Sequence, residues 1–379
     1  MKKKREATRQ DGSTAVRSRV LSKLAVLAGV VGSFFGFVTN LYSSEFRDAI
    51  ESSANGLDAA IFRTLLAVVV SSVSTAMAYW FVIRRRQQPS VKRGEIEIQP
   101  DALDVVSSDQ DAVVGRSLKY LEAKRSSDEL LIFMSGLGLD AGDFQLYMAE
   151  SKLHCIALTL YGFNVEERSD DRYEPISLES HVELVLYALQ KIREKNNGKR
   201  ITLVGFSYGA DILLFLAQFA ARQMKNLRID KVLLLDPNVS RSTMTISSRV
   251  AQVQLDQPLE QLHKVLESAA SVEEFRNLCE YLYKITAKNF AQVLRQAHDV
   301  VAMWPDDTHD VFLDRLGKLM AVTADVRVVV SFNYQAIFNR VARGVTSRGL
   351  NIGLLECAQN DHFDLIGTTF LKNRLEGMT

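Results

Sequence analysis

Beyond residue 125, short apolar runs alternate with longer helical patterns, and this order constrains the fold more than any other feature of the sequence. Runs rich in Val, Ile and Leu between amphipathic segments are typical of a parallel sheet flanked by helices. The expected strands are Leu130 to Met134, Cys155 to Leu160, Ile201 to Gly205, Lys231 to Leu235, Val326 to Val330 and Ile352 to Glu356. Helical spacing at 178–195 and 210–224 predicts crossover helices, so the expected class is α/β.

One interval, from Arg241 to about Met320, interrupts this alternation with helical patterns only. The interval therefore predicts a helical cap at 241–320, inserted between core parts at 126–240 and 321–379. With 47% apolar and 24% charged residues, the chain has enough apolar material for a core. Its 46 basic and 45 acidic residues give a net charge of +1, which offers no electrostatic basis for binding nucleic acid.

Two uncharged apolar segments, Leu24 to Tyr42 and Thr64 to Ile83, precede this region. As helices, each could span about 30 Å of hydrocarbon. We expect a transmembrane hairpin at 24–86, a basic tail at 1–23, and a linker and lead-in at 87–125. Buried helices are the alternative. A cleaved signal peptide fits less well, because no AxA-like site follows the first segment and the second would have no explanation.

The charges around the two segments predict their orientation. Basic residues lie before the first segment and after the second, whereas the loop between them is acidic. Both termini and the large C-terminal domain should therefore be cytoplasmic, in an inner or plasma membrane. The three cysteines lack CxxC spacing, which agrees with a reducing compartment and gives no metal site. The arginines after the second segment are placed to contact membrane lipids.

Gly32 and Gly36 form a GxxxG pair within the first apolar segment. Small residues at this spacing let another helix approach closely. The partner could be a second protomer, which would make a homo-oligomer, or the second segment of the same chain.

The sequence Gly205-Phe-Ser207-Tyr-Gly209 lies where an apolar strand runs directly into a helix. A sharp strand-to-helix turn needs small residues around a central serine, whose hydroxyl is then exposed. A serine hydroxyl is a weak nucleophile and needs a base, usually an imidazole. His362 follows the last expected strand, so a loop would present it at the carboxyl edge of the sheet. The other five histidines favour structural or exposed roles.

This order of strand, GxSxG turn, helical insertion and late histidine resembles the α/β-hydrolase superfamily over residues 126–379. The segment Phe133-Met-Ser-Gly-Leu137-Gly is similar to the oxyanion loop of that family, with a serine where a histidine commonly stands. The resemblance implies that the backbone N–H groups of Leu137 and Tyr208 hold the oxyanion. It implies the α/β-hydrolase fold with a helical cap insertion, and the two expected transmembrane helices precede this fold.

The catalytic acid departs from the common pattern of the family. The stretch before the last strand, Val328 to Gln335, contains no carboxylate. Asp236, at the end of the preceding strand and followed by proline, resembles the placement in some lipases. A turn or helix-capping role would equally suit an Asp-Pro pair. Asp361 and a Ser-His dyad are the other possibilities.

The predicted function is a membrane-anchored serine hydrolase, of the esterase, lipase or thioesterase type, acting on an acyl ester or lipid substrate. Ser207, His362 and Asp236 would form the catalytic triad, and neither a metal nor an organic cofactor is implied. The alternative is a catalytically inactive α/β-hydrolase fold that serves as a membrane scaffold. The presence of Ser207, His362 and both glycines of the turn favours the enzyme.

Overall fold

The computed structural model describes residues 90–100, 107–168, 174–253, 258–267, 269 and 271–376. Residues from Gln88 onward form one compact unit. Within the described residues, no helix is both long enough and apolar enough to cross a bilayer. The expected spans at 24–42 and 64–83, and with them Gly32 and Gly36, lie outside the described residues.

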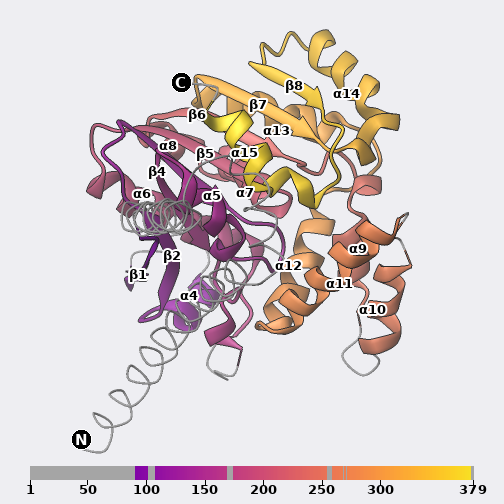
Figure 1. Cartoon of the computed structure of the whole chain (residues 1–379), viewed down its shortest axis with the longest axis horizontal. Coiled ribbons are helices and arrows are strands. Elements are labelled where there is room, and N and C mark those ends of the chain that lie inside the picture. The colour runs from indigo at the N-terminus through magenta and orange to yellow at the C-terminus, as the bar shows by residue number, and fades with distance from the viewer. Residues whose placement is uncertain are drawn as a thin grey trace, which may run out of the picture. The chain divides into compact units, whose positions relative to one another are not determined.

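An eight-stranded sheet in the order β1-β2-β4-β3-β5-β6-β7-β8 organises this unit (Figure 1). Strand β2 runs antiparallel to both of its neighbours, β1 and β4, and all the other pairs are parallel. The strands are β1 Lys92–Glu97, β2 Ser117–Ala123, β3 Glu129–Met134, β4 His154–Thr159, β5 Arg200–Phe206, β6 Ile229–Leu235, β7 Asp325–Val330 and β8 Leu354–Cys357. The expected mostly parallel sheet is confirmed.

The central strands are buried on both faces. Every residue of β3 and β4 is buried, as is every residue of β5 after Arg200. Continuous apolar runs suit such strands because helices cover both faces of a parallel sheet. Strands β1 and β2 lie in the segment expected as linker and lead-in. Their sequences, KRGEIE and SLKYLEA, are polar and partly exposed and contain no continuous apolar run that would predict a strand.

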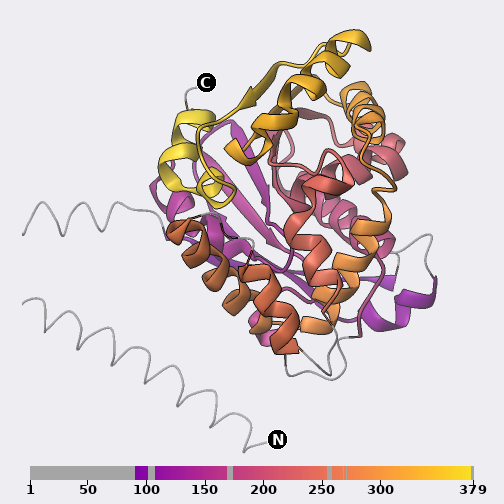
Figure 2. The ribbon, with the colours of Figure 1, turned by 90° about the vertical axis from the view of Figure 1, so that its right-hand side faces the viewer.

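Helices lie on both faces of the sheet (Figure 2). Helices α6, α7 and α13 contact one another in series, with α8 and α14 beside α13, whereas α5 and α15 pack together. The expected helix at 210–224 is two helices, α7 and α8, which meet at Ala220. The bounds are α4 Ser107–Val113, α5 Gln145–Glu150, α6 Leu178–Lys195, α7 Tyr208–Phe219, α8 Ala221–Asn226, α13 Asp310–Val322, α14 Gln335–Ser347 and α15 Thr368–Leu375. Short 3₁₀ helices are η2 Ala141–Phe144, η3 Val165–Glu167, η4 Arg241–Thr243, η5 Phe332–Tyr334 and η6 Phe363–Ile366.

Four helices inserted between β6 and β7 lie together in Figure 1, and we call them the cap helices. They are α9 Thr245–Ala251, α10 Pro258–Leu266, α11 Val272–Thr286 and α12 Phe290–Ala302. Helix α13, which the cap expected at 241–320 included, packs instead against α7, α8 and β7. Its buried residues Phe312, Leu316 and Leu319 belong to the apolar core, so α13 is a crossover helix.

The buried centre of β3 predicts a large stability effect. Ile132 is 0% exposed, and its truncation in Ile132→Ala should lower the free energy of unfolding by about 2–5 kcal/mol. The control, Val272→Ala, removes a side chain that is 78% exposed and should change it by less than about 0.5 kcal/mol. Thermal and urea unfolding of the detergent-solubilised chain measures both. Equal effects would contradict the packing described for β3.

Candidate active site

Ser207 occupies a strained turn between β5 and α7. Its φ of 51° and ψ of −121° lie in a region that side chains rarely adopt. Close packing explains the two glycines. A Cβ at Gly209 would lie 2.3 Å from the Met134 carbonyl oxygen, and one at Gly205 would lie 2.7 Å from the Cα of Ala210. The turn therefore brings the start of α7 directly onto the end of β3.

His362 and Asp236 meet at the carboxyl edge of the sheet. The Nδ1–H of His362 donates to Oδ2 of Asp236 at 2.6 Å, and the backbone N–H of Ser331 donates to Oδ1 of Asp236 at 2.6 Å. The Asp236 side chain is 1% exposed. Because Nδ1 carries the proton in this bond, Nε2 of the neutral ring is left as an acceptor. Asp236 thus holds the imidazole in the tautomer that a general base requires.

Asp361, the other candidate acid, points elsewhere. Its Oδ1 accepts from the backbone N–H of Asp364 at 3.0 Å, and its Oδ2 accepts from Asn277 Nδ2 at 3.3 Å. The carboxylate therefore caps the turn after His362 and contacts helix α11. The structure brings Asp236, and not Asp361, against the imidazole of His362.

A cavity of about 300 Å³ contains the three candidate catalytic residues. Ser207, Asp236 and His362 all line it, as do side chains from α9, α11 and the loop after β7. Its other lining residues are Asn238, Thr243, Met244, Thr245, Ile246, Ser247, Glu274, Leu278, Asn333, Tyr334, Asp361 and Phe363. The ring of His362 also packs on Phe206, with centroids 4.7 Å apart. Among the described residues, no cluster of His, Cys, Asp and Glu could hold a metal ion.

The loop after β3 lies beside Ser207. Leu137, Ser207 and His362 line one small cavity, which adjoins the larger one. The Ser135 hydroxyl donates to the Asp140 carbonyl at 2.8 Å and closes the loop, and Gly138 adopts a φ of +68°. Within the described part of the chain, the backbone N–H groups of Leu137 and Tyr208 donate no hydrogen bond to protein. Both are therefore available to an oxyanion.

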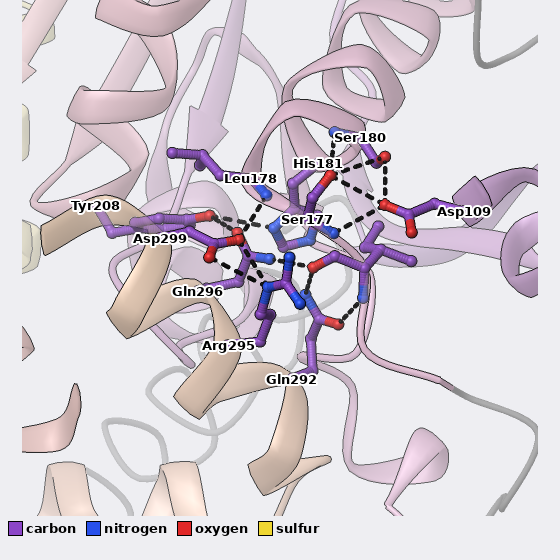
Figure 3. A network of polar contacts seen from close by, with 11 residues as sticks. Asp109, Ser177, Leu178, Ser180, His181, Tyr208, Gln292, Arg295, Gln296 and Asp299 are labelled. Atoms are coloured by element: carbon purple, nitrogen blue, oxygen red, sulfur yellow. Dashed lines mark hydrogen bonds and ion pairs between the residues drawn. The ribbon is translucent and has the colours of Figure 1, made fainter. Parts of the chain in front are cut away.

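The side chain of Tyr208 is anchored in a buried polar network (Figure 3). Its hydroxyl lies 2.5 Å from Oε1 of Gln296 on α12 and 3.1 Å from Nδ1 of His181 on α6. Nε2–H of His181 donates to the Tyr161 carbonyl at 3.0 Å. Burial lowers the pKa of His181 to about 4, so the ring is neutral and structural at neutral pH. The network fixes Tyr208, the residue after Ser207, to both the core and a cap helix.

The same network continues along the junction between α6 and α12. Asp299 accepts from the backbone N–H of Leu178 at 3.0 Å and pairs with Arg295 at 3.0 Å (Figure 3). Gln296 Nε2 donates to the Ile176 carbonyl at 2.7 Å. Helix α12 is therefore held against the first turn of α6 by several polar contacts and cannot rotate about its axis without breaking them.

Asp211 supports the loop that carries Asp236, a role that the sequence analysis missed. The Asp211 side chain is 0% exposed and accepts from the backbone N–H of Asn238 at 3.1 Å and from its Nδ2 at 2.5 Å. A lone carboxylate in the apolar helix YGADILLFLAQF was the available signal, because a charge in such a helix requires a buried partner. Burial raises the pKa of Asp211 to about 7.

The raised pKa of Asp211 predicts a pH dependence of stability. Between pH 4 and about pH 7 the folded protein retains a proton that the unfolded chain has released, so this group's contribution to stability falls as pH rises through that window. Asp211→Asn should remove the contribution. The wild type should lose more stability between pH 4.5 and 7.5 than the variant does, by about 1 kcal/mol or more.

Thermal unfolding at the two pH values measures this difference. The exposed Asp111 on α4 gives the control, and Asp111→Asn should keep the pH dependence of the wild type. Identical pH profiles for the wild type and Asp211→Asn would contradict the assignment.

Comparison with known proteins finds no matching family model and no matching curated protein. Solved structures do match. A carboxylesterase of Nitrososphaera gargenis is 14% identical, with a TM-score of 0.51 over 69% of this chain and 93% of that chain. An AqdC variant that cleaves the ring of the Pseudomonas quinolone signal is 12% identical, with a TM-score of 0.52 over 76% of this chain and 100% of that chain. Together with the strand order, these likenesses show that the chain has the α/β-hydrolase fold.

Proposed function

We propose that this protein is a serine hydrolase that cleaves an ester or thioester through an acyl-enzyme. The observation that carries the proposal is the 2.6 Å hydrogen bond between His362 and the buried Asp236, in the cavity that Ser207 also lines. A strained serine, a correctly protonated imidazole and a buried carboxylate are the three parts of a hydrolytic triad. A purely structural fold has no need of the strained serine.

In this mechanism Ser207 Oγ attacks the acyl carbon while His362 Nε2 accepts its proton. Negative charge develops on the carbonyl oxygen, and the N–H groups of Leu137 and Tyr208 donate hydrogen bonds to it. Asp236 stabilises the imidazolium that forms and remains ionised itself. His362 then protonates the leaving group. A water molecule, activated by the same imidazole, releases the acyl group from Ser207.

Two observations favour an acyl substrate. Met244, Ile246 and Leu278 contribute apolar side chains to the lining of the catalytic cavity, and apolar surface of this kind suits a hydrocarbon chain. A structural neighbour with the same fold is a carboxylesterase. Another neighbour cleaves a quinolone ring, so the fold alone does not choose the reaction, and the proposal depends on the site.

A fluorophosphonate probe tests this function directly, because it labels only an activated serine. Wild-type protein in detergent should be labelled, and Ser207→Ala should not be. The rate of labelling should fall by about 10⁴-fold or more in His362→Ala. It should fall by about 10³–10⁴-fold in Asp236→Asn, which leaves the imidazole ring without its orienting carboxylate.

Ser242→Ala and His263→Ala, which change exposed residues, serve as controls and should label like the wild type. Folded wild-type protein that takes no label, even with lipid present, would contradict the hydrolase and favour the scaffold. Labelling that survives in Ser207→Ala would place the nucleophile elsewhere.

We further propose that residues 24–86 anchor the enzyme as a transmembrane hairpin with the hydrolase domain in the cytoplasm. The proposal is supported by the length of the two uncharged segments and by the basic residues on their outer flanks. An anchor would keep the cavity close to membrane lipids. The Gly32 and Gly36 pair would then provide a contact for the second span or for another protomer.

Cysteine labelling in intact cells tests this topology. With the native cysteines replaced by alanine, Asn55→Cys in the acidic loop should react with a membrane-impermeant maleimide before lysis. Ser90→Cys, after the second segment, should react only after lysis. The reverse pattern would invert the orientation, and release of the full chain by alkaline carbonate would contradict the anchor.

A further inference from the structure

Tyr281, on cap helix α11, has a buried hydroxyl without a protein partner. The residue is 4% exposed, and its hydroxyl forms no hydrogen bond with the described residues. Buried hydroxyls in native proteins are almost always hydrogen-bonded, so an exception requires an explanation. Burial also raises the pKa of the Tyr281 phenol, which therefore remains a protonated donor at neutral pH.

The position of Tyr281 supplies that explanation. Its side chain lines the small cavity that contains Leu137, Ser207 and His362. It also lines a second cleft, of about 360 Å³, formed by residues of η2, α11 and η6 with their neighbours. We call this second space the η2–η6 cleft. Tyr281 thus lies at the junction between the reacting serine and a separate space large enough for part of a substrate.

Charged side chains line the η2–η6 cleft. They are Asp143, Glu280, Lys284 and Asp364. Lys284 Nζ is 2.8 Å from Asp143 Oδ1 and 3.0 Å from Glu280 Oε1. Three carboxylates against one ammonium leave the lining with an excess of negative charge. A polar group that is not anionic therefore suits the η2–η6 cleft.

We propose that the η2–η6 cleft is the leaving-group subsite, that it accepts a polar alcohol and prefers positive over negative charge, and that Tyr281 donates a hydrogen bond to the leaving oxygen. The inference rests on the proposed function, which it deepens by naming the substrate class. Tyr281 is in this view a catalytic residue contributed by the cap.

The step that Tyr281 assists is the collapse of the tetrahedral intermediate. The bond from Ser207 Oγ to the acyl carbon has formed, and the bond from that carbon to the leaving oxygen breaks. The electron pair of the broken bond goes to the leaving oxygen, which takes the proton held on His362 Nε2. Tyr281 keeps its own proton, and its hydrogen bond strengthens as charge develops on the leaving oxygen.

Tyr281→Phe removes the donor and preserves the ring that packs on Phe363, whose centroid lies 5.7 Å away. For butyrate esters of poorly leaving alcohols such as choline, kcat/KM should fall roughly 10- to 100-fold. The loss should be smaller for the p-nitrophenyl ester, because nitrophenolate needs less stabilisation. The loss for the choline ester should also exceed any loss in the rate of fluorophosphonate labelling, in which fluoride is the leaving group.

Tyr283→Phe is the matched control, since it makes the same change on the same helix at a residue that is 75% exposed. It should leave all these rates within about twofold of the wild type. A Tyr281→Phe defect that is the same for every leaving group, or no greater than that of the control, would overturn the catalytic role.

Charge and size of the alcohol test the cleft itself. At low ionic strength the choline ester should react at least about threefold faster than the isethionate ester, which has an anionic sulfonate in place of the trimethylammonium group. Leu146→Trp narrows the cleft from an exposed position on α5, and should reduce kcat/KM for the choline ester while sparing the methyl ester. Gln145→Trp, beside it but outside the lining, should spare both.

Equal or faster reaction of the isethionate ester would overturn the preference for positive charge. A Leu146→Trp defect that follows the length of the acyl chain and not the size of the alcohol would overturn the assignment of the cleft. These failures are distinct from failure of the proposed function. The latter would appear as wild-type protein that neither takes the fluorophosphonate label nor hydrolyses any ester.

Discussion

One buried carboxylate connects the parts of the sheet edge on which the site depends. Asp236 ends β6, its backbone N–H donates to the Val329 carbonyl of β7 at 2.8 Å, and its side chain accepts from Ser331 after β7 and from His362 after β8. A carboxylate that is 1% exposed requires such partners, because an unpaired buried charge is strongly unfavourable. The hydrogen bonds that this buried carboxylate requires therefore fix the imidazole of His362 relative to the strands.

The strain at Ser207 is offset by the packing around it. The backbone N–H of Ser207 donates to the Leu235 carbonyl of β6 at 2.8 Å, which ties the turn to the neighbouring strand. Asp236, the residue after Leu235, shares the same φ of 51°. Two adjacent strands thus each end in a left-handed residue, and one hydrogen bond links the two turns. The geometry between the serine and the acid is set by the sheet rather than by flexible loops, which is the precision that the proposed catalysis would require.

The parallel core and most residues of the candidate site could be identified in the sequence, because their signals are local. After Glu129, strand β3 is a continuous apolar run, and the glycines around Ser207 reflect contacts that only glycine permits. Strands β1 and β2 could not be identified, since the edge strand β1 and its partly exposed neighbour β2 both carry charged residues. Helix α13 has the same amphipathic pattern as a cap helix, and only the surface it packs against distinguishes the two.

Residues that act through distant contacts left no comparable signal. Tyr281 is one of 11 tyrosines in the chain, and neither its spacing nor its neighbours in sequence mark it as different. Its environment is created by the approach of α11 to the loop after β3, more than a hundred residues earlier. In the same way, the partner of Asp211 is a backbone N–H and an amide in another loop. Such residues become visible only when the fold brings the segments together.

The contacts between α11 and the loop after β3 connect the cap to the candidate site. Lys284 of α11 pairs with Asp143. Just after α11, Lys288 Nζ lies 2.7 Å from Asp140 Oδ2 as a charge contact without hydrogen-bond geometry. A Cβ at Gly138 would lie 2.6 Å from Ile285, so the cap packs directly on the loop that contains Leu137. Because Tyr208 is fixed to α12 through Gln296, both N–H groups proposed to bind the oxyanion are held by cap helices as well as by the core. Displacement of the cap would therefore disturb both proposed oxyanion donors in a single movement, and such donors stabilise charge most strongly when the fold holds them in place.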